Sequence, residues 1–144
     1  MQHLEQAVEQ HLATAGVRLT QARRVTIEAL ATMRGPRTVA EIHDHVDGAV
    51  PLSSLYRSLS VLTDADVLSA QHGSDGATRF ELAEWITGHH HHLICTSCGT
   101  VVDVTPTVAQ EKSMEQLVKK MAREAGFDVS GHRFEIEGTC RACR

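Results

Sequence analysis

The sequence is poor in aromatic residues and contains no long apolar run. Aromatic residues make up 3% of the 144 residues, although hydrophobic residues together make up 42%. We therefore expect a core that is filled by aliphatic side chains. No segment is long and apolar enough for a transmembrane helix, and no signal-peptide pattern follows Met1. These two absences predict a cytoplasmic protein without a membrane partner.

A strong net charge and enzyme motifs are also missing. The formal net charge of -4 gives no overall attraction to nucleic acid or to an anionic membrane. The sequence has no H-E-x-x-H motif and no nucleophile motif, so we do not expect an enzyme. A zinc hydrolase would also need an open coordination position and a general base, for which Glu81 or Glu84 is the nominal choice. A length of 144 residues suits one ordinary domain or two small ones.

One stretch, by contrast, is rich in metal-binding side chains. Residues 89–98 contain four histidines and two cysteines, and a second Cys-x-x-Cys pair closes the sequence. The pairs would form two disulfides in a secreted chain, whereas in a cytosolic chain they favour a zinc site. Two residues between thiols let both sulfurs of a tight turn face one tetrahedral ion, and Gly99 gives this turn backbone freedom. We predict a closed, structural Zn²⁺ site formed by Cys95, Cys98, Cys140 and Cys143.

Apolar residues at helical spacing predict three helices in the first 46 residues. Each helix has a start or stop signal, either a capping threonine or a glycine or proline break. The helices cover residues 3–15, the segment from Thr20 to the break at Arg34-Gly35-Pro36, and the segment from about Thr38 to Val46.

A fourth helix and a β-hairpin complete this half of the chain. The helix covers residues 55–65 and is capped by Ser53 or Ser54. Two short strands, residues 67–71 and 77–82, flank a turn-rich connection. Three helices after a leading one, followed by a hairpin, is the order of a winged helix-turn-helix, in which the fourth helix is the recognition helix and the hairpin the wing. A small α+β domain without a DNA role is the alternative.

Local charge favours DNA binding by this half. Residues 14–60 hold six arginines against four acidic residues, and phosphate neutralisation by such side chains is the main source of non-specific DNA affinity. The arginines are Arg18, Arg23, Arg24, Arg34, Arg37 and Arg57.

The second half is typical of a small antiparallel sheet with one helix. Strands are expected over residues 89–94, 100–104, 127–129 and 132–138, and a helix from Pro106 to about Ala122. One helix cannot cover both faces of this sheet, so we expect a homodimer. The predicted fold is therefore α+β, with an N-terminal winged helix-turn-helix domain and a C-terminal small α/β dimerisation domain. Residues 1–84 form the first, residues 85–88 the hinge, and residues 89–144 the second, metal-binding domain.

The histidine run points to two further metal sites. Alternate residues of a strand face opposite sides, so His90 and His92 share one side and His89 and His91 the other. Neutral imidazole is the commonest metal ligand at cytosolic pH, which makes a merely solvated strand the weaker interpretation.

Taken in order, five motifs resemble the ferric uptake regulator (Fur) family. They run over nearly the whole chain, and the combination is specific although each piece alone is weak. The motifs are Arg18-Leu19-Thr20-Gln21-Ala22-Arg23, Ser54-Leu55-Tyr56-Arg57-Ser58-Leu59, Arg79-Phe80-Glu81-Leu82, the stretch from His89 to Gly99, and Gly131-His132-Arg133-Phe134-Glu135-Ile136 before Cys140-x-x-Cys143. The resemblance implies a homodimeric, metal-dependent repressor that binds an AT-rich palindromic DNA operator.

The resemblance also implies a set of DNA-binding residues. Tyr56 and Arg57 match the base- and phosphate-contacting pair of the recognition helix, and Arg18 matches a minor-groove probe. A phenol packs against a thymine methyl, and a guanidinium forks onto guanine or phosphate. Ser53 and Ser54 lie at the start of the helix, where a phosphate is well received. The alternative for Tyr56 is half-buried packing beneath the wing.

In the family pattern, a regulatory metal binds between the domains. Its ligands here would be Glu81, His90, His92 and Asp103. The family usually adds a histidine from the third helix, but that position falls near Arg37, which cannot bind a metal. His72 at the wing turn is a substitute, and His43 and His45 are nearby candidates that are more simply explained as solvated residues.

A second metal site is implied on the other side of the histidine run. His89, His91 and His132 would bind there together with an acidic residue. The family's acidic position aligns with Gln110 here, and the adjacent Glu111 is the replacement that we expect.

The number of donors bears on the identity of the regulatory metal. Five or six histidine and carboxylate donors suit Fe²⁺, whereas four tetrahedral donors suit Zn²⁺. Without the third-helix histidine, the set favours Zn²⁺, and residues 131–143 resemble the zinc uptake regulator branch. That branch often has a cysteine near Glu81, and none is present. Sensing of iron, manganese, nickel or peroxide remains open, and a metal storage or chaperone protein without DNA binding is the alternative from another class.

Overall fold

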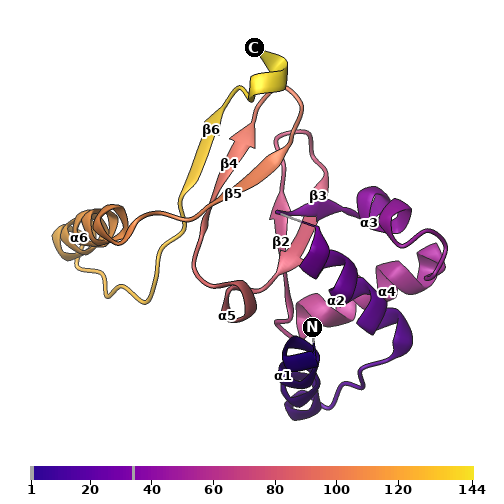
Figure 1. The fold of residues 1–144 in the computed structure, drawn as a ribbon. Coiled ribbons are helices and arrows are strands. Elements are labelled where there is room, and N and C mark those ends of the chain that lie inside the picture. The colour runs from indigo at the N-terminus through magenta and orange to yellow at the C-terminus, as the bar shows by residue number, and fades with distance from the viewer. Residues whose placement is uncertain (1, 34) are drawn as a thin grey trace.

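The structure is a computed structural model that describes residues 2–33 and 35–144. Arg34, part of the expected break after the second helix, lies outside the described residues, as does Met1. Figure 1 shows two small sheets, with α1 to α4 gathered beside the first and α6 standing beyond the second. The strand orders are β1-β3-β2 and β5-β4-β6. The chain therefore has the predicted α+β fold.

The N-terminal helices close around an aliphatic core. They are α1 (Gln2–Thr14), α2 (Gln21–Thr32), α3 (Val39–His45) and α4 (Leu52–Asp64). Thr20 caps α2 by accepting a hydrogen bond from the backbone N–H of Arg23, and Thr38 and Glu41 form a capping box on α3. As expected from the few aromatic residues, the largest fully buried side chains are almost all aliphatic. They include Leu12, Ile42, Leu55, Leu59, Leu62 and Leu68.

The fourth helix begins earlier than the sequence predicted. Its N-cap is Pro51, which has no side chain that can cap, so Ser53 and Ser54 lie inside the first turn rather than at its cap. The preset backbone of Pro51 (φ -57°) allows the helix to start directly after it. The first turn of α4 therefore carries no side-chain cap on its N–H groups.

The wing is a three-stranded sheet. β2 (Leu68–His72) pairs antiparallel with β3 (Thr78–Leu82), close to the predicted strands. A short strand that the sequence did not predict, β1 (Arg37–Thr38), pairs with Phe80 and Arg79 on the other edge of β3. A strand of two residues has no periodicity of its own, and only its pairing with β3 defines it.

The predicted hinge is partly helical. Residues 84–87 form α5 (Glu84–Thr87), and Gly88 ends it with a φ of 83°, a value that only glycine adopts easily. Trp85 on this helix stacks on His11 of α1, with ring centroids 4.6 Å apart. Its indole N–H also donates to the carbonyl of Asp66 at 2.7 Å, so the hinge helix is held against the N-terminal domain.

The second sheet is smaller than predicted. β4 (His91–Cys95) begins two residues later than expected, and it pairs antiparallel with β5 (Val101–Val104). The expectation of an antiparallel sheet is wrong for the other edge, because β6 (Glu135–Gly138) follows α6 and runs parallel to β4. The expected strand over residues 127–129 is wrong, because that segment crosses from α6 to β6 and has no strand beside it. The predicted strand over residues 132–138 is reduced to β6.

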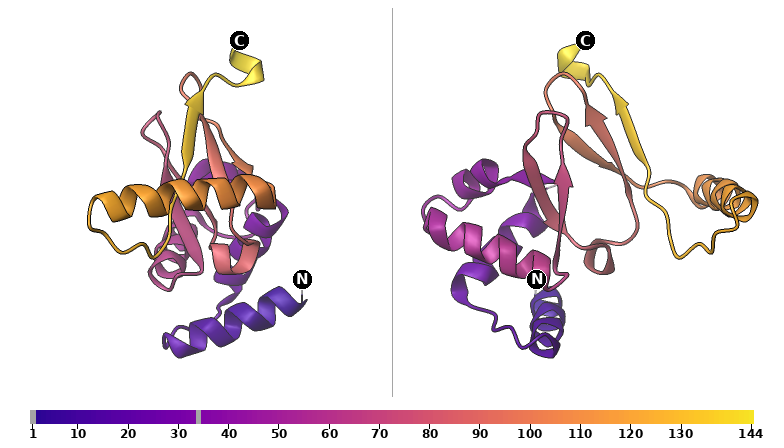
Figure 2. Two further views of the ribbon diagram at one scale, coloured as in Figure 1. Left: turned by 90° about the vertical axis from the view of Figure 1, so that its left-hand side faces the viewer. Right: turned by 180° about the vertical axis from the view of Figure 1, so that it is seen from behind.

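Helix α6 (Val108–Glu124) leaves the sheet and packs little against it. It starts two residues after Pro106, where Thr107 and Gln110 form a capping box. Figure 2 shows it projecting from the body of the chain, and none of its residues is buried. Among the described residues, no helix combines the length and apolarity needed to cross a membrane.

Candidate metal centres and DNA-binding surface

Three groups of metal-binding side chains lie in or beside the second sheet. Within each group, one ligand atom per residue lies within 4.8 Å of all the others. We name them the four-cysteine cluster (Cys95, Cys98, Cys140, Cys143), the hinge cluster (Glu81, His90, His92, Asp103) and the α6 cluster (His89, His91, Glu111, His132).

The four-cysteine cluster is assembled by the pairing of β4 with β6. Cys95 ends β4 and lies opposite Gly138 of β6, which brings the second cysteine pair to the turn after β4. All four thiols are free, and the Sγ atoms of Cys98 and Cys140 are 3.8 Å apart. The turn closes where Gly99, with a φ of 73°, donates its N–H to the carbonyl of Cys95 at 2.9 Å. Four sulfur donors in this arrangement fit a tetrahedral Zn²⁺ ion.

The pKa values of these thiols show how crowded they are. The backbone N–H of Cys140, 3.3 Å from Sγ of Cys95, is the largest of several hydrogen bonds that lower the pKa of Cys95 to about 6. Hydrogen bonds with Cys140 and Cys98 instead raise the pKa of Cys143 to about 12. The first thiol thus loses its proton easily and the last holds it. A divalent cation would allow all four to ionise together.

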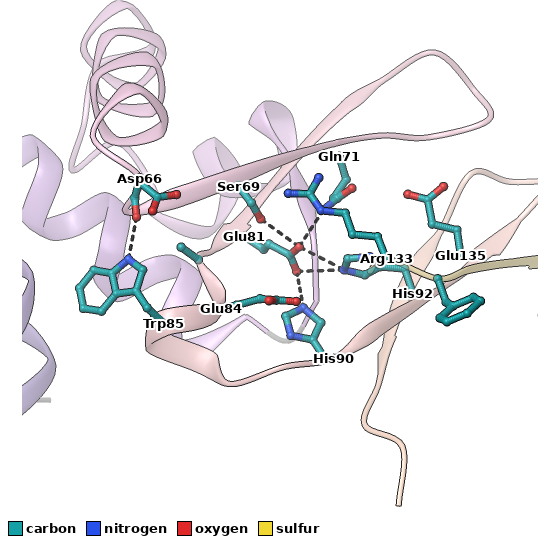
Figure 3. Close-up of a pocket in the computed structure, with 12 residues that line it drawn as sticks. Asp66, Ser69, Gln71, Glu81, Glu84, Trp85, His90, His92, Arg133 and Glu135 are labelled. Atoms are coloured by element: carbon teal, nitrogen blue, oxygen red, sulfur yellow. Dashed lines mark hydrogen bonds and ion pairs between the residues drawn. The ribbon is translucent and has the colours of Figure 1, made fainter. Parts of the chain in front are cut away.

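The hinge cluster joins the two sheets. Glu81 comes from β3 of the wing, whereas His92 and Asp103 come from the paired strands β4 and β5. Nε2 of His92 lies 3.1 Å from Oε1 of Glu81, and Nε2 of His90 lies 3.2 Å from Oε2. Asp103 completes the group, with Oδ1 3.7 Å from Nε2 of His92. Figure 3 shows both imidazoles pointing at the Glu81 carboxylate.

Two polar residues of β2 orient the Glu81 carboxylate. The Ser69 hydroxyl donates to Oε1 at 3.1 Å, and the Gln71 amide donates to the same oxygen at 3.2 Å (Figure 3). The side chain of Glu81 is 8% exposed, so these bonds are made in a largely dry setting. Sequence reasoning missed both residues. Their alternation on the strand beside Glu81 was the available signal.

Charges in the hinge cluster are balanced only in part. Burial would raise the pKa of Glu81, but hydrogen bonds and charge interactions with His92 and His90 outweigh it and lower the pKa. Burial lowers the pKa of His90 in turn, yet the Gly88 carbonyl and Glu81 together raise it. The pKa of Asp103 is shifted in the opposite direction from that of Glu81, because burial and the Glu81 carboxylate both raise it. A bound cation would relieve that repulsion.

A cavity of about 270 Å³ opens beside the hinge cluster. Glu81, His90, His92, Trp85 and Arg133 are among the residues that line it (Figure 3). Solvent and metal ions can therefore reach the two imidazoles. The sole tryptophan of the chain lines the same cavity.

The α6 cluster lies on the opposite side of the histidine run. The Glu111 carboxylate is its centre, at 3.3 Å from Nε2 of His89, 3.2 Å from Nε2 of His91 and 3.0 Å from Nε2 of His132. Nε2 of His132 is buried, and its close contact with Glu111 does not have the geometry of a hydrogen bond. Gln110 is the N3 residue of the α6 capping box, since its Oε1 accepts the Thr107 N–H at 2.9 Å. Gln110 therefore caps the helix, whereas its neighbour Glu111 belongs to the α6 cluster.

The other candidate ligands are not brought to these clusters. His72 is exposed at the end of β2, 3.4 Å from the Thr78 hydroxyl, whereas Glu81 pairs with Ser69 further along the strand. The side chain of Arg37 forms an ion pair with Glu41 at 3.3 Å. His45 contacts the Thr32 hydroxyl at 3.1 Å. The hinge cluster therefore has four protein donors among the described residues.

The predicted DNA-contacting residues lie on an open surface. Tyr56 is 57% exposed, which favours a surface role over packing beneath the wing. Arg57 and Ser53 are exposed beside it on α4, and Ser54 is partly buried, with its carbonyl accepting the Ser58 hydroxyl at 2.7 Å. Arg18 is exposed in the segment before α2. Tyr56, Arg57, Ser53 and Arg18 are therefore open to a partner.

The fold and the clusters define a class: a winged-helix protein with a second domain that carries metal-binding groups. The sequence model of the ferric uptake regulator family matches residues 14–137. The chain therefore belongs to the ferric uptake regulator family, whose members are metal-responsive transcriptional regulators rather than enzymes. The resemblance seen in the sequence motifs is confirmed.

Known proteins support this assignment over nearly the whole chain. The peroxide operon regulator of Bacillus subtilis (strain 168) is 29% identical over 143 residues, which cover 97% of this chain and 92% of the relative. The ferric uptake regulator of Vibrio cholerae has a TM-score of 0.73 and 26% identity, covering 92% of this chain and 98% of that chain. A zinc-bound manganese uptake regulator has a TM-score of 0.68 and 29% identity, covering 92% and 97%.

Proposed function

We propose that this chain is a metal-activated transcriptional repressor that controls genes of metal uptake or homeostasis. The hinge cluster carries this proposal, because its donors come from both domains. Glu81 belongs to the wing sheet, whereas His90, His92 and Asp103 belong to the second domain. A divalent metal held there would supply positive charge to two carboxylates and fix the angle between the domains.

Each ligand has a distinct part in this mechanism. Glu81 would connect the metal to the wing, because it lies on β3 and its carboxylate is oriented by hydrogen bonds from Ser69 and Gln71. His90 takes a fixed orientation, since its Nδ1 lies 2.9 Å from the Gly88 carbonyl and its Nε2 faces Glu81. Asp103 lies nearby with a raised pKa, so it gains most from an added cation. Metal binding would therefore favour the conformation in which all four meet.

The DNA-binding face would be presented by α4. Tyr56 and Arg57 would contact bases and phosphate, and Arg18 would reach the minor groove. Ser53 and Ser54 in the uncapped first turn would receive a phosphate, because the N–H groups there have no side-chain partner. The expected partner is an AT-rich, palindromic double-stranded operator, because a two-fold dimer binds a two-fold site.

A homodimer would cover apolar side chains that one copy leaves exposed. Leu93 and Val102 are 39% and 48% exposed on the second sheet, and Ile136 of β6 is 56% exposed. Leu117 and Met121 of α6 are 53% and 60% exposed. These residues lie on the same domain, whose helix projects from the body (Figure 2). A second copy on this domain would place two recognition helices on one operator.

We assign structural Zn²⁺ to the four-cysteine cluster and favour Zn²⁺ over Fe²⁺ at the hinge cluster. The hinge cluster has four protein donors and includes neither His72 nor a residue at the position of Arg37. A set of four donors is compatible with tetrahedral zinc. The α6 cluster would hold a second metal ion through His89, His91, Glu111 and His132.

Iron or peroxide sensing is the second candidate. Two carboxylates and two imidazoles at the hinge also suit Fe²⁺ when water fills the remaining positions, and the adjacent cavity admits water. The name of the Bacillus subtilis relative, a peroxide operon regulator, favours this candidate as well. A metal storage protein would use the same clusters without any effect on DNA.

Fluorescence anisotropy with labelled duplexes tests the function. A randomised-site selection would supply the duplexes, which are then titrated under chelator, buffered Zn²⁺ and anaerobic Fe²⁺, with the four-cysteine zinc retained. Tight DNA binding only after addition of metal is the expected result. The metal that activates DNA binding at its buffered cytosolic concentration then identifies the sensed metal and the branch of the family. Absence of DNA binding under every metal would overturn the repressor and favour storage.

A further inference from the structure

The tip of the wing touches the four-cysteine cluster. Residues 73–76, here called the wing turn, connect β2 to β3, and in Figure 1 they lie beside the turn between β4 and β5. The Ser74 hydroxyl donates to the carbonyl of Cys95 at 3.1 Å. A Cβ atom on Gly99 would collide with the Asp75 carboxylate, so these two residues are in direct contact. The contact joins segments of different sheets.

The wing turn is held in the shape that this contact requires. Both carboxylate oxygens of Asp75 accept hydrogen bonds from the Arg79 guanidinium, at 2.9 and 2.8 Å. Arg79 is only 7% exposed, and a side chain at Gly73 would collide with it. The Asp75 carboxylate also accepts the N–H of Ala77 at 3.1 Å. Asp75 is therefore fixed against Gly99 by contacts within the wing.

Electrostatics link the wing turn to the cysteines. The Arg79 guanidinium donates two hydrogen bonds to the Asp75 carboxylate, and that carboxylate contacts Gly99, the residue directly after Cys98. A zinc ion bound by four thiolates carries a net negative charge. The positively charged guanidinium of Arg79 would therefore be attracted to the zinc-bound four-cysteine cluster.

The same strand reaches the hinge cluster at its other end. Glu81 follows Arg79 by two residues on β3 and faces His90 and His92. The wing hairpin is thus attached to the second domain at two points, one at each end. Both attachments exist in one conformation, in which the four hinge donors lie within 4.8 Å of one another.

We propose that the wing turn is a latch on the four-cysteine cluster, which couples the state of that cluster to metal affinity at the hinge cluster. This inference rests on the metal binding that we propose for the hinge cluster. Contacts made in the metal-binding conformation favour metal binding, and the coupling is reciprocal. Loss of the Ser74 or Asp75 contact, or damage to the cysteine turn, therefore lowers hinge affinity without touching any hinge ligand.

The test compares three variants of the full chain with zinc retained in the four-cysteine cluster. Ser74→Ala removes the bond to the Cys95 carbonyl, and Asp75→Ala removes the contact with Gly99. Thr78→Ala is the matched control, because its hydroxyl lies 3.4 Å from His72 and is not among the wing-turn residues that touch the cysteines. All carry His132→Ala, which removes one ligand of the α6 cluster.

Co²⁺ is the probe for the hinge cluster. Trp85 lines the cavity with three hinge donors, so quenching of its fluorescence reports Co²⁺ bound there, and chelator competition gives the dissociation constant. Ser74→Ala should weaken Co²⁺ binding by up to about fivefold, the typical worth of one hydrogen bond. Asp75→Ala should weaken it by about tenfold, because it removes the contact with Gly99 and also the bonds to Arg79 that hold the wing turn in the shape that the contacts with the cysteine turn require. Thr78→Ala should leave it unchanged.

The outcomes separate the latch from the proposed function. Tight Co²⁺ binding to the unaltered chain, with Ser74→Ala and Asp75→Ala within twofold of Thr78→Ala, would overturn the latch alone. Absence of Co²⁺ binding at the hinge in the unaltered chain would overturn the proposed function together with the latch. Hydrogen exchange gives a readout that does not depend on the variants. Co²⁺ should slow exchange of the amides of residues 73–79 in the unaltered chain, and unchanged exchange there would count against the latch.

Discussion

Glu81 and His92 belong to different sheets, yet Oε1 of Glu81 and Nε2 of His92 lie 3.1 Å apart. The domains of this chain therefore meet through a carboxylate and an imidazole that both bind metals well. An apolar contact at this position would hold the domains together at all times. If the hinge cluster binds a metal as proposed, a pair of metal ligands instead makes their contact depend on that ion.

Replacement of Glu81 by glutamine should uncouple metal from DNA binding. Glu81→Gln keeps the size of the side chain but removes the charge, so hinge metal affinity should fall at least about 100-fold. Metal-dependent anisotropy with operator DNA should disappear, while the zinc bound by the cysteines stays. Glu137→Gln, an exposed residue on β6, is the control and should behave like the parent. An unchanged response of Glu81→Gln would place the sensed metal elsewhere.

The residues that orient Glu81 should matter nearly as much. Ser69→Ala and Gln71→Ala each remove one of the hydrogen bonds to Oε1. We expect a loss of about tenfold in hinge metal affinity for each, since partners of a metal ligand fix its orientation. Competition with a chromophoric chelator measures this. If both variants kept parental affinity, the two bonds would be incidental to the site.

Removal of one cysteine should destabilise the second domain. Cys140→Ser leaves three thiols, and the ion that joins β6 to the turn after β4 should be lost or weakly held. Without this cross-link, stability should fall by roughly 3 kcal/mol, which lowers the melting temperature by about 6–12 °C. Zinc analysis and differential scanning calorimetry test this prediction. An equal loss of stability for Ser130→Ala, an exposed residue before β6, would contradict a specific role of the thiol.

Substitutions on the open face of α4 should change DNA affinity and leave folding intact. Arg57→Ala should weaken operator binding about tenfold or more, and Tyr56→Ala should weaken it by a similar factor. Tyr56 is 57% exposed, so thermal stability should stay within about 0.5 kcal/mol of the parent. Salt dependence distinguishes their roles, because loss of a phosphate contact lowers the slope of log affinity against log salt by about 1. Parental affinity in both variants would remove α4 from the interface.

Most of the helices and strands could be predicted from local sequence patterns. The helices were predictable because their apolar spacing and threonine caps act within a few residues, as at Thr20 and Thr38. β1 and α5 were missed, since two and four residues are too short for any periodicity. The strand expected over residues 127–129 failed for the opposite reason, as a suitable pattern without a neighbouring strand does not form a sheet.

The clusters were predictable only where spacing sets the geometry. Alternation along the chain separates His90 and His92 from His89 and His91, and the structure shows these two pairs in different clusters. His72 was the expected substitute for the missing third-helix histidine, at the start of the turn in the wing. The register of β2 and β3, however, pairs His72 with Thr78 and leaves Ser69 opposite Glu81. The register of two strands depends on the whole hairpin and cannot be predicted from any single residue.

The parallel pairing of β4 with β6 also bears on the lifetime of the protein. Cys98 and Cys140 are 42 residues apart, so the four-cysteine cluster closes a long loop. A cross-link around such a loop is worth roughly 4 kcal/mol, and the zinc ion that we propose for this cluster would supply it reversibly. Copies synthesised under zinc starvation would lack this staple and expose β6 and the segment before it to proteases. Protein abundance would then record the zinc supply at the time of synthesis, on a slower timescale than metal exchange at the hinge.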